Sequence, residues 1–483
     1  MTSQEVRVRI APSPTGNLHV GTARTALFNW LFAKRYNGKF VLRIEDTDLE
    51  RSENKYVQNI YDSLKSIGLN WDEGPDIGGE YAPYKQSERN EVYVKYVQKL
   101  LDSGHAYYCY CSQEELEAEK LEAQKEKRDF IYSGRCKKLS PQDAEKFSTE
   151  GKQPVIRFSM PSRFLTFKDL VKGEIEFDTS LTSDFVIMKS NGTPTYNFAV
   201  VVDDIEMKIS HIIRGEDHIS NTPRQIILYE ALGAKVPEFA HLGMILAPDR
   251  SKLSKRHGAT AVSEFIEQGY LPEAFVNFLA LLGWSPADEQ EIKPLNEIAG
   301  QFSLDRVSSA PAIFEFDKLN WMNGMYIRNL PLEEITQRSL KYIEKYDLSV
   351  YTEEQLMKIV DAVRNNLTKL SEISDAVIYF FGEDVQIDEE TRENILKTPE
   401  SQQVLQEFSE LAKNFDYKDT EKINEQLGEF RKQMKPLKPK QVMWAVRTAL
   451  TGRTHGADIA VVISLLGRDR ILKRVQNAIT ANV

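Results

Sequence analysis

Cysteine is scarce in this chain. Its 483 residues include only three cysteines, and two of them stand together in Cys109-Tyr110-Cys111. Three thiols cannot build the disulfide framework on which small secreted domains depend. We therefore expect reduced thiols or a metal-binding cluster.

Long apolar runs are also missing. No stretch reaches the eighteen apolar residues that a membrane-spanning helix needs, and the N-terminus lacks a basic segment followed by an apolar one. We therefore expect a cytoplasmic protein that contacts no membrane. The length exceeds what one hydrophobic core usually organises, so we expect three or more domains.

Positive charge is in deficit overall, with a net charge of −10, but its distribution is uneven. Residues 431–483 contain eleven Lys or Arg and two Asp, a local net of +9, so the other 430 residues carry −19. A basic block on an acidic chain suits contact with a polyanion. On charge alone, a solvated helical face is the simpler interpretation.

The pattern of apolar residues predicts an α/β fold. Alternation over 6–10, helical spacing over 23–31 and a strand-like run over 40–44 predict a strand–helix–strand unit. Similar signals predict strands at 185–189 and 209–214 and helices at 196–207 and 222–232. These segments predict one parallel nucleotide-binding sheet, split by an insertion of roughly ninety residues.

The remaining segments are predicted to be helical. Residues 114–128, within the insertion, are almost entirely charged and predict an exposed helix with no chemistry of its own. From about Asp305 onward the pattern is mainly helical, for example over 333–345 and 354–367.

Two short signatures predict phosphate binding. In the first, Pro12 to Thr22, Gly16 shapes a turn, and Gly21 lets a ligand approach the N-terminus of a helix, which attracts phosphate. His19 can donate a hydrogen bond to phosphate oxygens; the alternative is that it only caps the helix. In the second, Lys252-Leu253-Ser254-Lys255-Arg256, the lysines suit charge on a transferring phosphoryl group. Together they favour an enzyme that holds one ATP from two sides, with His19, Lys252 and Lys255 as its catalytic residues.

These and further motifs resemble the class I aminoacyl-tRNA synthetases, and within them the bacterial-type glutamyl-tRNA synthetases, over essentially the whole chain. The common class I form ends its first motif in a second histidine, whereas Thr22 is usual in the glutamate branch. The motifs are Arg9 to Gly16, His19 to Thr22, Arg43 to Asp48, Thr193 to Asn197, Ile213 to Asp217 and Lys252 to Arg256.

The resemblance implies four regions. A split Rossmann-like catalytic domain with a parallel sheet would cover 1–92 and 181–232, and an inserted α/β acceptor-stem domain would cover 93–180. A mostly α-helical stem-contact region over 233–325 would carry the Lys252–Arg256 loop, and 326–483 would form an all-α anticodon-binding domain.

It also implies a monomer that joins L-glutamate to tRNA(Glu) in two steps. The α-carboxylate of glutamate attacks the α-phosphate of ATP, bound with Mg²⁺, to give glutamyl-adenylate and pyrophosphate. The terminal ribose of tRNA then takes the glutamyl group. Members of this branch require bound tRNA for the first step.

Site residues follow from the same motifs. Arg214 would grip the side-chain carboxylate of glutamate bidentately, and Glu45 would bind its ammonium group. The alternative for each residue is a structural ion pair, which the sequence alone favours for Glu45. The full glutamate set is Arg9, Ser13, Glu45, Tyr196 and Arg214, and the ATP set is Thr15, Gly16, His19, Gly21, Thr22, Asp217 and Lys255.

Some family members bind zinc through a Cys-x-Cys pair, a third Cys and a nearby His. Here Cys109, Cys111 and Cys136 are present, but Lys138 stands two residues after the third cysteine. Zinc needs four ligands, so Tyr132 or a water would have to complete the site. Zinc and three reduced thiols both stay open as interpretations.

Three other functions were weighed. Glutaminyl-tRNA synthetases share the core, but Arg214 and a helical C-terminal region argue against one. A shorter paralogue that modifies a tRNA base lacks the anticodon domain, and intact His19 and Lys255 argue against an inactive tRNA-binding protein. Strictly specific members carry an arginine pair in the anticodon domain. Here Arg364 is followed by two asparagines, so tRNA(Gln) stays open as a second acceptor.

Overall fold

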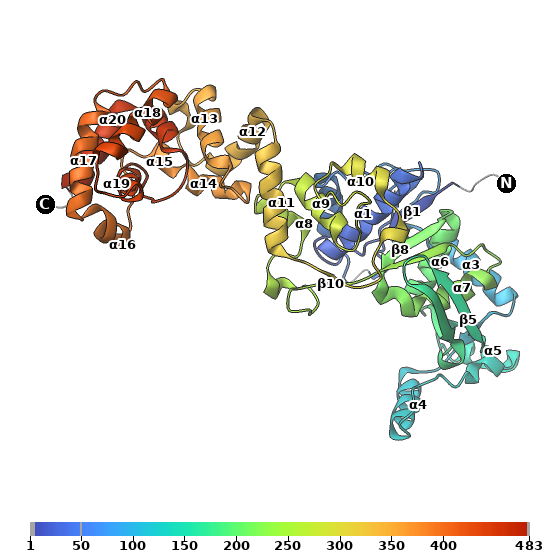
Figure 1. Cartoon of the computed structure of the whole chain (residues 1–483). Helices are drawn as coiled ribbons and strands as arrows, with labels where there is room; N and C mark the ends of the chain where they lie inside the picture. Colours follow the sequence, from blue (N-terminus) through green and yellow to red (C-terminus); the bar gives the residue numbers. More distant parts are fainter. Residues whose placement is uncertain (1–4, 49–50, 481–483) are drawn as a thin grey trace. The chain divides into compact units, whose positions relative to one another are not determined.

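The computed structural model describes residues 5–48 and 51–480. Residues 1–4 and 481–483, which begin and end the predicted domains, and residues 49–50 lie outside the described part. The chain forms two compact units (Figure 1). The first comprises Met1–Phe265 and Phe275–Glu315, and the second comprises Ile266–Ala274 and Phe316–Val483.

The first unit begins with the predicted strand–helix–strand motif. β1 (Arg7–Ile10) and β2 (Lys39–Leu42) pair in parallel, and α1 (Val20–Arg35) connects them. Parallel strands need such a crossover helix, and α1 is buried at every position from Ala23 to Ala33, eight of which are apolar.

A second parallel pair of strands lies beside the first. β8 (His211–Gly215) and β9 (Glu238–Leu242) pair in parallel across α7 (Thr222–Ala231). Ser210, just before β8, donates its backbone N–H to the carbonyl of Arg7 in β1, so the two pairs lie side by side. The predicted parallel α/β sheet is confirmed.

One predicted strand belongs to another sheet. β7 (Phe185–Met188) pairs antiparallel with β4 (Val155–Phe158), which pairs antiparallel with β3 (Ala106–Cys109). The prediction that 185–189 joins the nucleotide-binding sheet is therefore wrong. Alternation shows which face of a strand is buried, but it does not show which strand lies beside it.

A hairpin from the predicted insertion joins the sheet that contains β8 and β9. β5 (Phe164–Asp169) pairs antiparallel with β6 (Gly173–Asp178). The last residue of β5, Asp169, is also the parallel partner of Phe239 in β9. The inserted segment thus contributes a residue to the edge of the sheet that carries β8 and β9.

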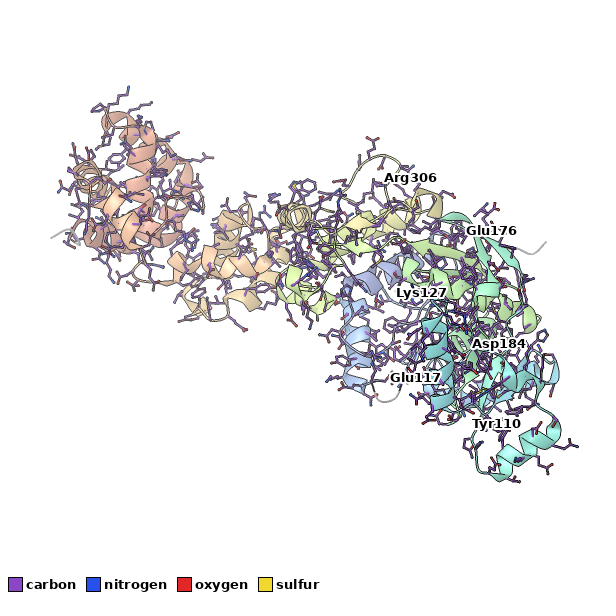
Figure 2. All side chains as sticks on the ribbon, turned by 90° about the horizontal axis from the view of Figure 1, so that it is seen from below. Tyr110, Glu117, Lys127, Glu176, Asp184 and Arg306 are labelled. Carbon is purple, nitrogen blue, oxygen red and sulfur yellow. The ribbon has the colours of Figure 1, made fainter. Side chains whose placement is uncertain are left out.

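The first unit also contains helices and short strands outside these sheets. The charged α4 (Gln113–Lys125) buries only Ala123, as expected for an exposed helix, and Figure 2 labels its Glu117. The remaining helices and strands are α2 (Asn54–Ser66), α3 (Asn90–Asp102), α5 (Pro141–Thr149), α6 (Tyr196–Glu206), β10 (Ile245–Leu246), α8 (Val262–Glu267), α9 (Pro272–Leu281), α10 (Leu295–Gln301) and β11 (Ala312–Ile313). Helices α8 and α9 each contribute residues to both units.

The second unit is helical throughout its described residues, which confirms the predicted all-α region. Its helices pack around one apolar core that includes Ile359, Phe408 and Val446. No helix in 5–48 or 51–480 is long and apolar enough to cross a membrane. The helices are α11 (Phe316–Asn329), α12 (Leu332–Ile343), α13 (Glu353–Arg364), α14 (Ile373–Ala376), α15 (Ile378–Phe381), α16 (Glu389–Thr391), α17 (Pro399–Ala412), α18 (Thr420–Gln433), α19 (Pro439–Thr451) and α20 (Ile459–Thr480).

The end of α19 gives a test of this core. Gly452 closes the helix at φ +74°, and a Cβ there would lie 2.2 Å from the carbonyl oxygen of Gln386. We expect Gly452→Ala to lower the free energy of unfolding by about 2 kcal/mol, measured by urea titration of the full chain. Gly428→Ala, inside α18 with no close neighbour, is the matched control and should raise it by about 0.5–1 kcal/mol. Equal midpoints for the two variants would contradict this account.

Candidate active site

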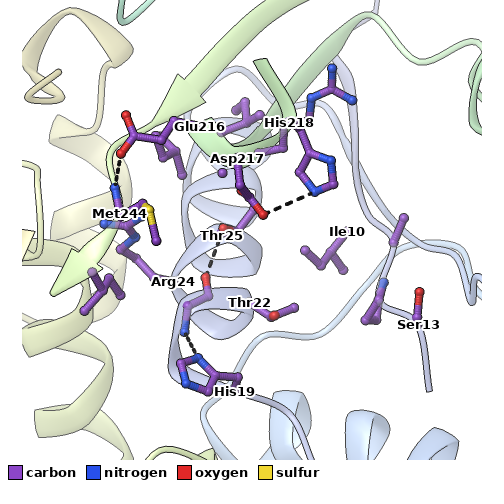
Figure 3. Close-up of a pocket in the computed structure, with 18 of the residues that line it drawn as sticks. Ile10, Ser13, His19, Thr22, Arg24, Thr25, Glu216, Asp217, His218 and Met244 are labelled. Carbon is purple, nitrogen blue, oxygen red and sulfur yellow. Dashed lines mark hydrogen bonds and ion pairs between the residues drawn. The ribbon is translucent and has the colours of Figure 1, made fainter. Parts of the chain in front are cut away.

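A cavity of about 480 Å³ opens where β1 and β8 end. Ligands of open parallel sheets bind at this edge, outside the carboxyl ends of the strands. Its lining combines the turn after β1, the first turns of α1 and the residues that follow β8 (Figure 3). Lys252 and Leu253, from the second phosphate signature, also line the cavity. Two segments that lie more than two hundred residues apart in the sequence therefore border the same cavity.

One ring nitrogen of His19 caps the N-terminus of α1. It is the N-cap residue, and its Nδ1 accepts the backbone N–H of Gly21 at 3.1 Å (Figure 3). Burial and the nearby charge of Lys252 lower the pKa of His19, so the ring is neutral near pH 7. Because Nδ1 accepts, Nε2 carries the proton and remains a donor. His19 can therefore cap the helix through Nδ1 and donate to a ligand through Nε2 at the same time.

The predicted ATP residues divide into two groups. His19, Gly21, Thr22 and Asp217 line the cavity. The cavity lining does not include Thr15, Gly16 or Lys255. Lys255 is exposed and begins a short 3₁₀ turn, Lys255–His257. A Cβ on Gly21 would meet His19 Nδ1 at 3.4 Å, so a side chain there would crowd the cap.

All five predicted glutamate residues line the cavity, and Arg214 has the most distinctive environment among them. Its side chain is buried, its Nη2 donates to Thr222 Oγ1 at 2.7 Å, and its Nε donates to His241 Nε2 at 3.1 Å. Its buried Nη1 has no hydrogen-bond partner within 5–48 and 51–480. Burial lowers the pKa of Arg214. A buried cation with an unused donor suits an anionic ligand.

Arg9 and Glu45 are held in a buried network of ion pairs. Asp204 accepts hydrogen bonds from Arg9 Nη2 at 3.2 Å and from Arg43 Nη1 at 2.6 Å. Arg43 Nη2 also donates to Glu45 Oε1 at 3.1 Å. Burial raises the pKa of Glu45, while the charges of Arg43 and Arg9 oppose the shift. Both residues are thus structural ion-pair members and cavity-lining residues at once.

Tyr196 and Ser13 complete the predicted glutamate set. Tyr196 begins α6, and its hydroxyl lies 3.1 Å from His218 Nδ1. Burial raises the pKa of Tyr196 to about 12, so it stays protonated and can donate. Ser13 lies in the turn after β1, across the cavity from Asp217 and His218 (Figure 3).

Several further residues of the cavity were not predicted from the sequence. Arg24 reaches the carbonyls of Leu282 and Gly243, and burial lowers its pKa to about 10. Glu216 accepts the backbone N–H of Met244 at 2.8 Å, which ties the loop after β9 to the end of β8 (Figure 3). Asp204 does not line the cavity but binds Arg9, which does. The sequence holds a signal for Asp204, because two adjacent aspartates inside the apolar helix α6 need buried partners.

The three cysteines meet in a separate cluster. The Sγ atoms of Cys109, Cys111 and Cys136 all lie within 4.8 Å of one another. The Tyr132 hydroxyl lies 3.1 Å from Cys111 Sγ and 3.4 Å from Cys109 Sγ. Arg135 Nε donates to Cys111 Sγ at 3.1 Å. The three sulfurs are close enough to supply three of the four donors of a zinc site.

Comparisons with known proteins agree along the whole chain. Residues 5–321 match the family of tRNA synthetases class I (E and Q), catalytic domain, and residues 334–479 match an anticodon binding domain. The chain is 48% identical to a glutamate–tRNA ligase of Carboxydothermus hydrogenoformans, over 98% of this chain and 99% of that one. It is 47% identical to a glutamate–tRNA ligase of Desulforamulus reducens, over 98% and 99%.

A solved structure agrees as well. The crystal structure of a glutamate tRNA ligase from Elizabethkingia meningosepticum in complex with its amino acid superposes with a TM-score of 0.92 at 35% identity, covering 99% of this chain and 100% of that one. The cavity, the two phosphate signatures and the helical second unit occur in one chain with full-length relatives of this kind. The chain belongs to the class I tRNA synthetases of the E and Q family.

Proposed function

We propose that this protein attaches L-glutamate to tRNA(Glu) at the expense of ATP. The free Nη1 of buried Arg214 is the observation that carries the proposal, because it offers a cationic donor inside the cavity. His19, Lys252 and the start of α1 form a second, phosphate-attracting part of the same cavity. The relatives named glutamate–tRNA ligase support the same substrate.

The first step needs position and charge rather than a protein nucleophile. A glutamate α-carboxylate oxygen attacks the α-phosphorus of ATP, and the bond to the leaving pyrophosphate breaks. His19 Nε2–H and Lys252 Nζ would donate to the phosphate oxygens, and Lys255 would approach from the neighbouring turn. Each such donor stabilises the transition state by about 3–4 kcal/mol. Mg²⁺ bound with ATP would neutralise part of the phosphate charge.

The second step transfers the glutamyl group. A hydroxyl of the terminal tRNA ribose attacks the carbonyl of glutamyl-adenylate, and AMP leaves. Arg9, Ser13, Glu45 and Tyr196 would hold the amino acid through both steps, and all four line the cavity with Arg214. We also propose that the protein acts as a monomer in the cytoplasm.

We assign the tRNA contacts to the regions named from the sequence. Residues 93–180 would contact the acceptor end, 233–325 the stem and 326–483 the anticodon, around the catalytic residues 1–92 and 181–232. Arg364 binds Asp361 Oδ1 at 2.8 Å and the carbonyl of Leu330, so its guanidinium is already engaged. We therefore include tRNA(Gln) as a second acceptor, and charging purified tRNA(Glu) and tRNA(Gln) in parallel tests this extension.

We also propose that Cys109, Cys111, Cys136 and Tyr132 hold one zinc ion. The three close sulfurs suit zinc, which prefers cysteine ligands, and the Tyr132 hydroxyl lies beside them as a fourth donor. Zinc there would stabilise the fold around β3 and take no part in the reaction.

Replacing Arg214 tests the amino-acid assignment. Arg214→Ala should weaken use of glutamate by the loss of a buried charge pair, about 2–5 kcal/mol in kcat/KM, with KM for ATP nearly unchanged. The measurement is ATP–pyrophosphate exchange with tRNA present. Arg214→Lys, which keeps the charge but not the fork, should be intermediate. Absence of exchange by the wild type with glutamate would refute the proposed function, and normal glutamate kinetics in Arg214→Ala would refute the role of Arg214.

Two replacements of His19 separate its two roles. His19→Asn keeps an N-cap but lacks the Nε2 donor, so kcat should fall about 10²–10³-fold with little change in thermal stability. His19→Ala should also lose about 1 kcal/mol of stability. That stability difference should shrink as the pH falls below about 6.5, because the unfolded His19 takes up a proton before the folded ring does. Full activity in His19→Asn would contradict the donor role.

Metal analysis tests the cysteine cluster. Protein purified without chelators should contain one zinc per chain by elemental analysis, and Cys111→Ser should retain little. Tyr132→Phe should release zinc to a chelator about 10–100-fold more readily, whereas Tyr110→Phe, the matched control between the two cysteines, should match the wild type. Zinc content near zero after reconstitution of the wild type would leave three reduced thiols as the correct interpretation.

A further inference from the structure

Three buried polar side chains form a line behind the cavity. Asp169 ends β5, His241 lies in β9 and Arg214 lies in β8, on three adjacent strands. Arg214 and His241 are register partners, and Asp169 pairs with Phe239 two residues earlier in β9. Their exposed fractions are 1%, 0% and 4%, so each polar group must be satisfied by its neighbours.

Asp169 is an anchored acceptor. Its Oδ1 accepts the backbone N–H groups of Val171 at 2.9 Å, Lys172 at 2.8 Å and His241 at 3.2 Å. Its Oδ2 lies 2.6 Å from His241 Nδ1. Burial alone would raise the pKa of Asp169, but the hydrogen bonds from His241 and the backbone outweigh it and lower the pKa. An ionised carboxylate can only accept, so Nδ1 of His241 carries a proton.

His241 passes this constraint to Arg214. Burial lowers the pKa of His241 despite its bond to Asp169, so the ring is neutral and its Nε2 can only accept. Nε2 takes the Nε–H of Arg214 at 3.1 Å. Thr222 Oγ1, 3.1 Å from the same nitrogen, accepts Nη2–H of Arg214 at 2.7 Å. Phe239 fixes the ring plane, because it stacks on His241 at an interplanar angle of 4°.

The guanidinium is thus held on two of its nitrogens. Nε and Nη2 are bound to His241 and Thr222, and Nη1 is the nitrogen without a partner among the described residues. A planar fork can bind a carboxylate only when its orientation is fixed, and a displacement of about 1 Å can cost about 100-fold in rate.

We propose that Asp169 fixes the tautomer of His241 and thereby the orientation of Arg214, which makes Asp169 and His241 positioning residues for recognition of the substrate's side-chain carboxylate. The inference rests on the proposed function, in which Arg214 binds that carboxylate. The opposite tautomer would point an N–H of His241 at the N–H of Arg214 and would turn the guanidinium away.

Asp169→Asn is the variant that reverses the tautomer. The Asn carbonyl can keep the backbone N–H groups that Asp169 Oδ1 accepts, which leaves the amide NH₂ facing Nδ1 of His241. Nδ1 must then accept, and the proton moves to Nε2. We expect KM for glutamate to rise about 10–100-fold, with KM for ATP and kcat at saturating glutamate within about twofold of the wild type. The ¹⁵N chemical shifts of His241 should report the exchanged tautomer.

A matched pair at His241 gives an independent test. Gln and Met have nearly the same shape, but only Gln offers an acceptor near the position of Nε2. We expect His241→Gln to keep a KM for glutamate near the wild-type value and His241→Met to raise it about 10–100-fold. This pair decides the question if Asp169→Asn fails to fold.

The outcomes separate this inference from the proposed function. If Arg214→Ala loses glutamate while Asp169→Asn and His241→Met keep the wild-type KM, the positioning role is overturned and the function stands. Equal losses in His241→Gln and His241→Met would likewise overturn it, because the acceptor would then be irrelevant. If the wild type does not activate glutamate at all, the proposed function itself fails.

Discussion

The cavity depends on one fully buried cation, Arg43. Its guanidinium, in the segment after β2, binds Asp204 and Glu45 and lies 3.6 Å from Asp203. Arg9 and Arg89 complete the group, so three arginines face three carboxylates and the buried charge is balanced. Removing one member of such a group would leave an unpaired buried charge, which costs about 3–5 kcal/mol. The network joins β1, β2 and α6 in one arrangement, and that arrangement sets where Arg9 and Glu45 meet the cavity.

Around this network the cavity has two chemically different parts. The end of β1 and the start of α1 supply backbone N–H groups, the helix dipole and His19 Nε2, all suited to phosphate. The end of β8 supplies Arg214, held by neighbours that leave one nitrogen free. Both parts lie at the carboxyl ends of neighbouring parallel strands, β1 and β8, where ligands of open α/β folds bind.

The sequence predicts most of this because its signals are local. Periodicity locates β1, α1, β2 and the helical second unit, and the motifs identify residues that line the cavity. Pairing between distant segments carries no such signal, so the sequence predicts neither the sheet that contains β7 nor the hydrogen bond between Arg214 and His241. Closeness in sequence does not ensure that two residues share a site. Lys255 lies three residues from Lys252 but is not part of the cavity lining.

The hairpin of β5 and β6 links the inserted segment to the catalytic core. It belongs by sequence to the segment assigned to the acceptor end of tRNA, yet its last residue, Asp169, pairs with β9 and anchors the residue beside Arg214. The inserted segment therefore cannot be exchanged without a change in the contacts of His241. A chimera that grafts a foreign acceptor domain between residues 93 and 180 would remove the carboxylate that binds His241 behind Arg214, so a compatible graft must supply an equivalent acceptor at that position.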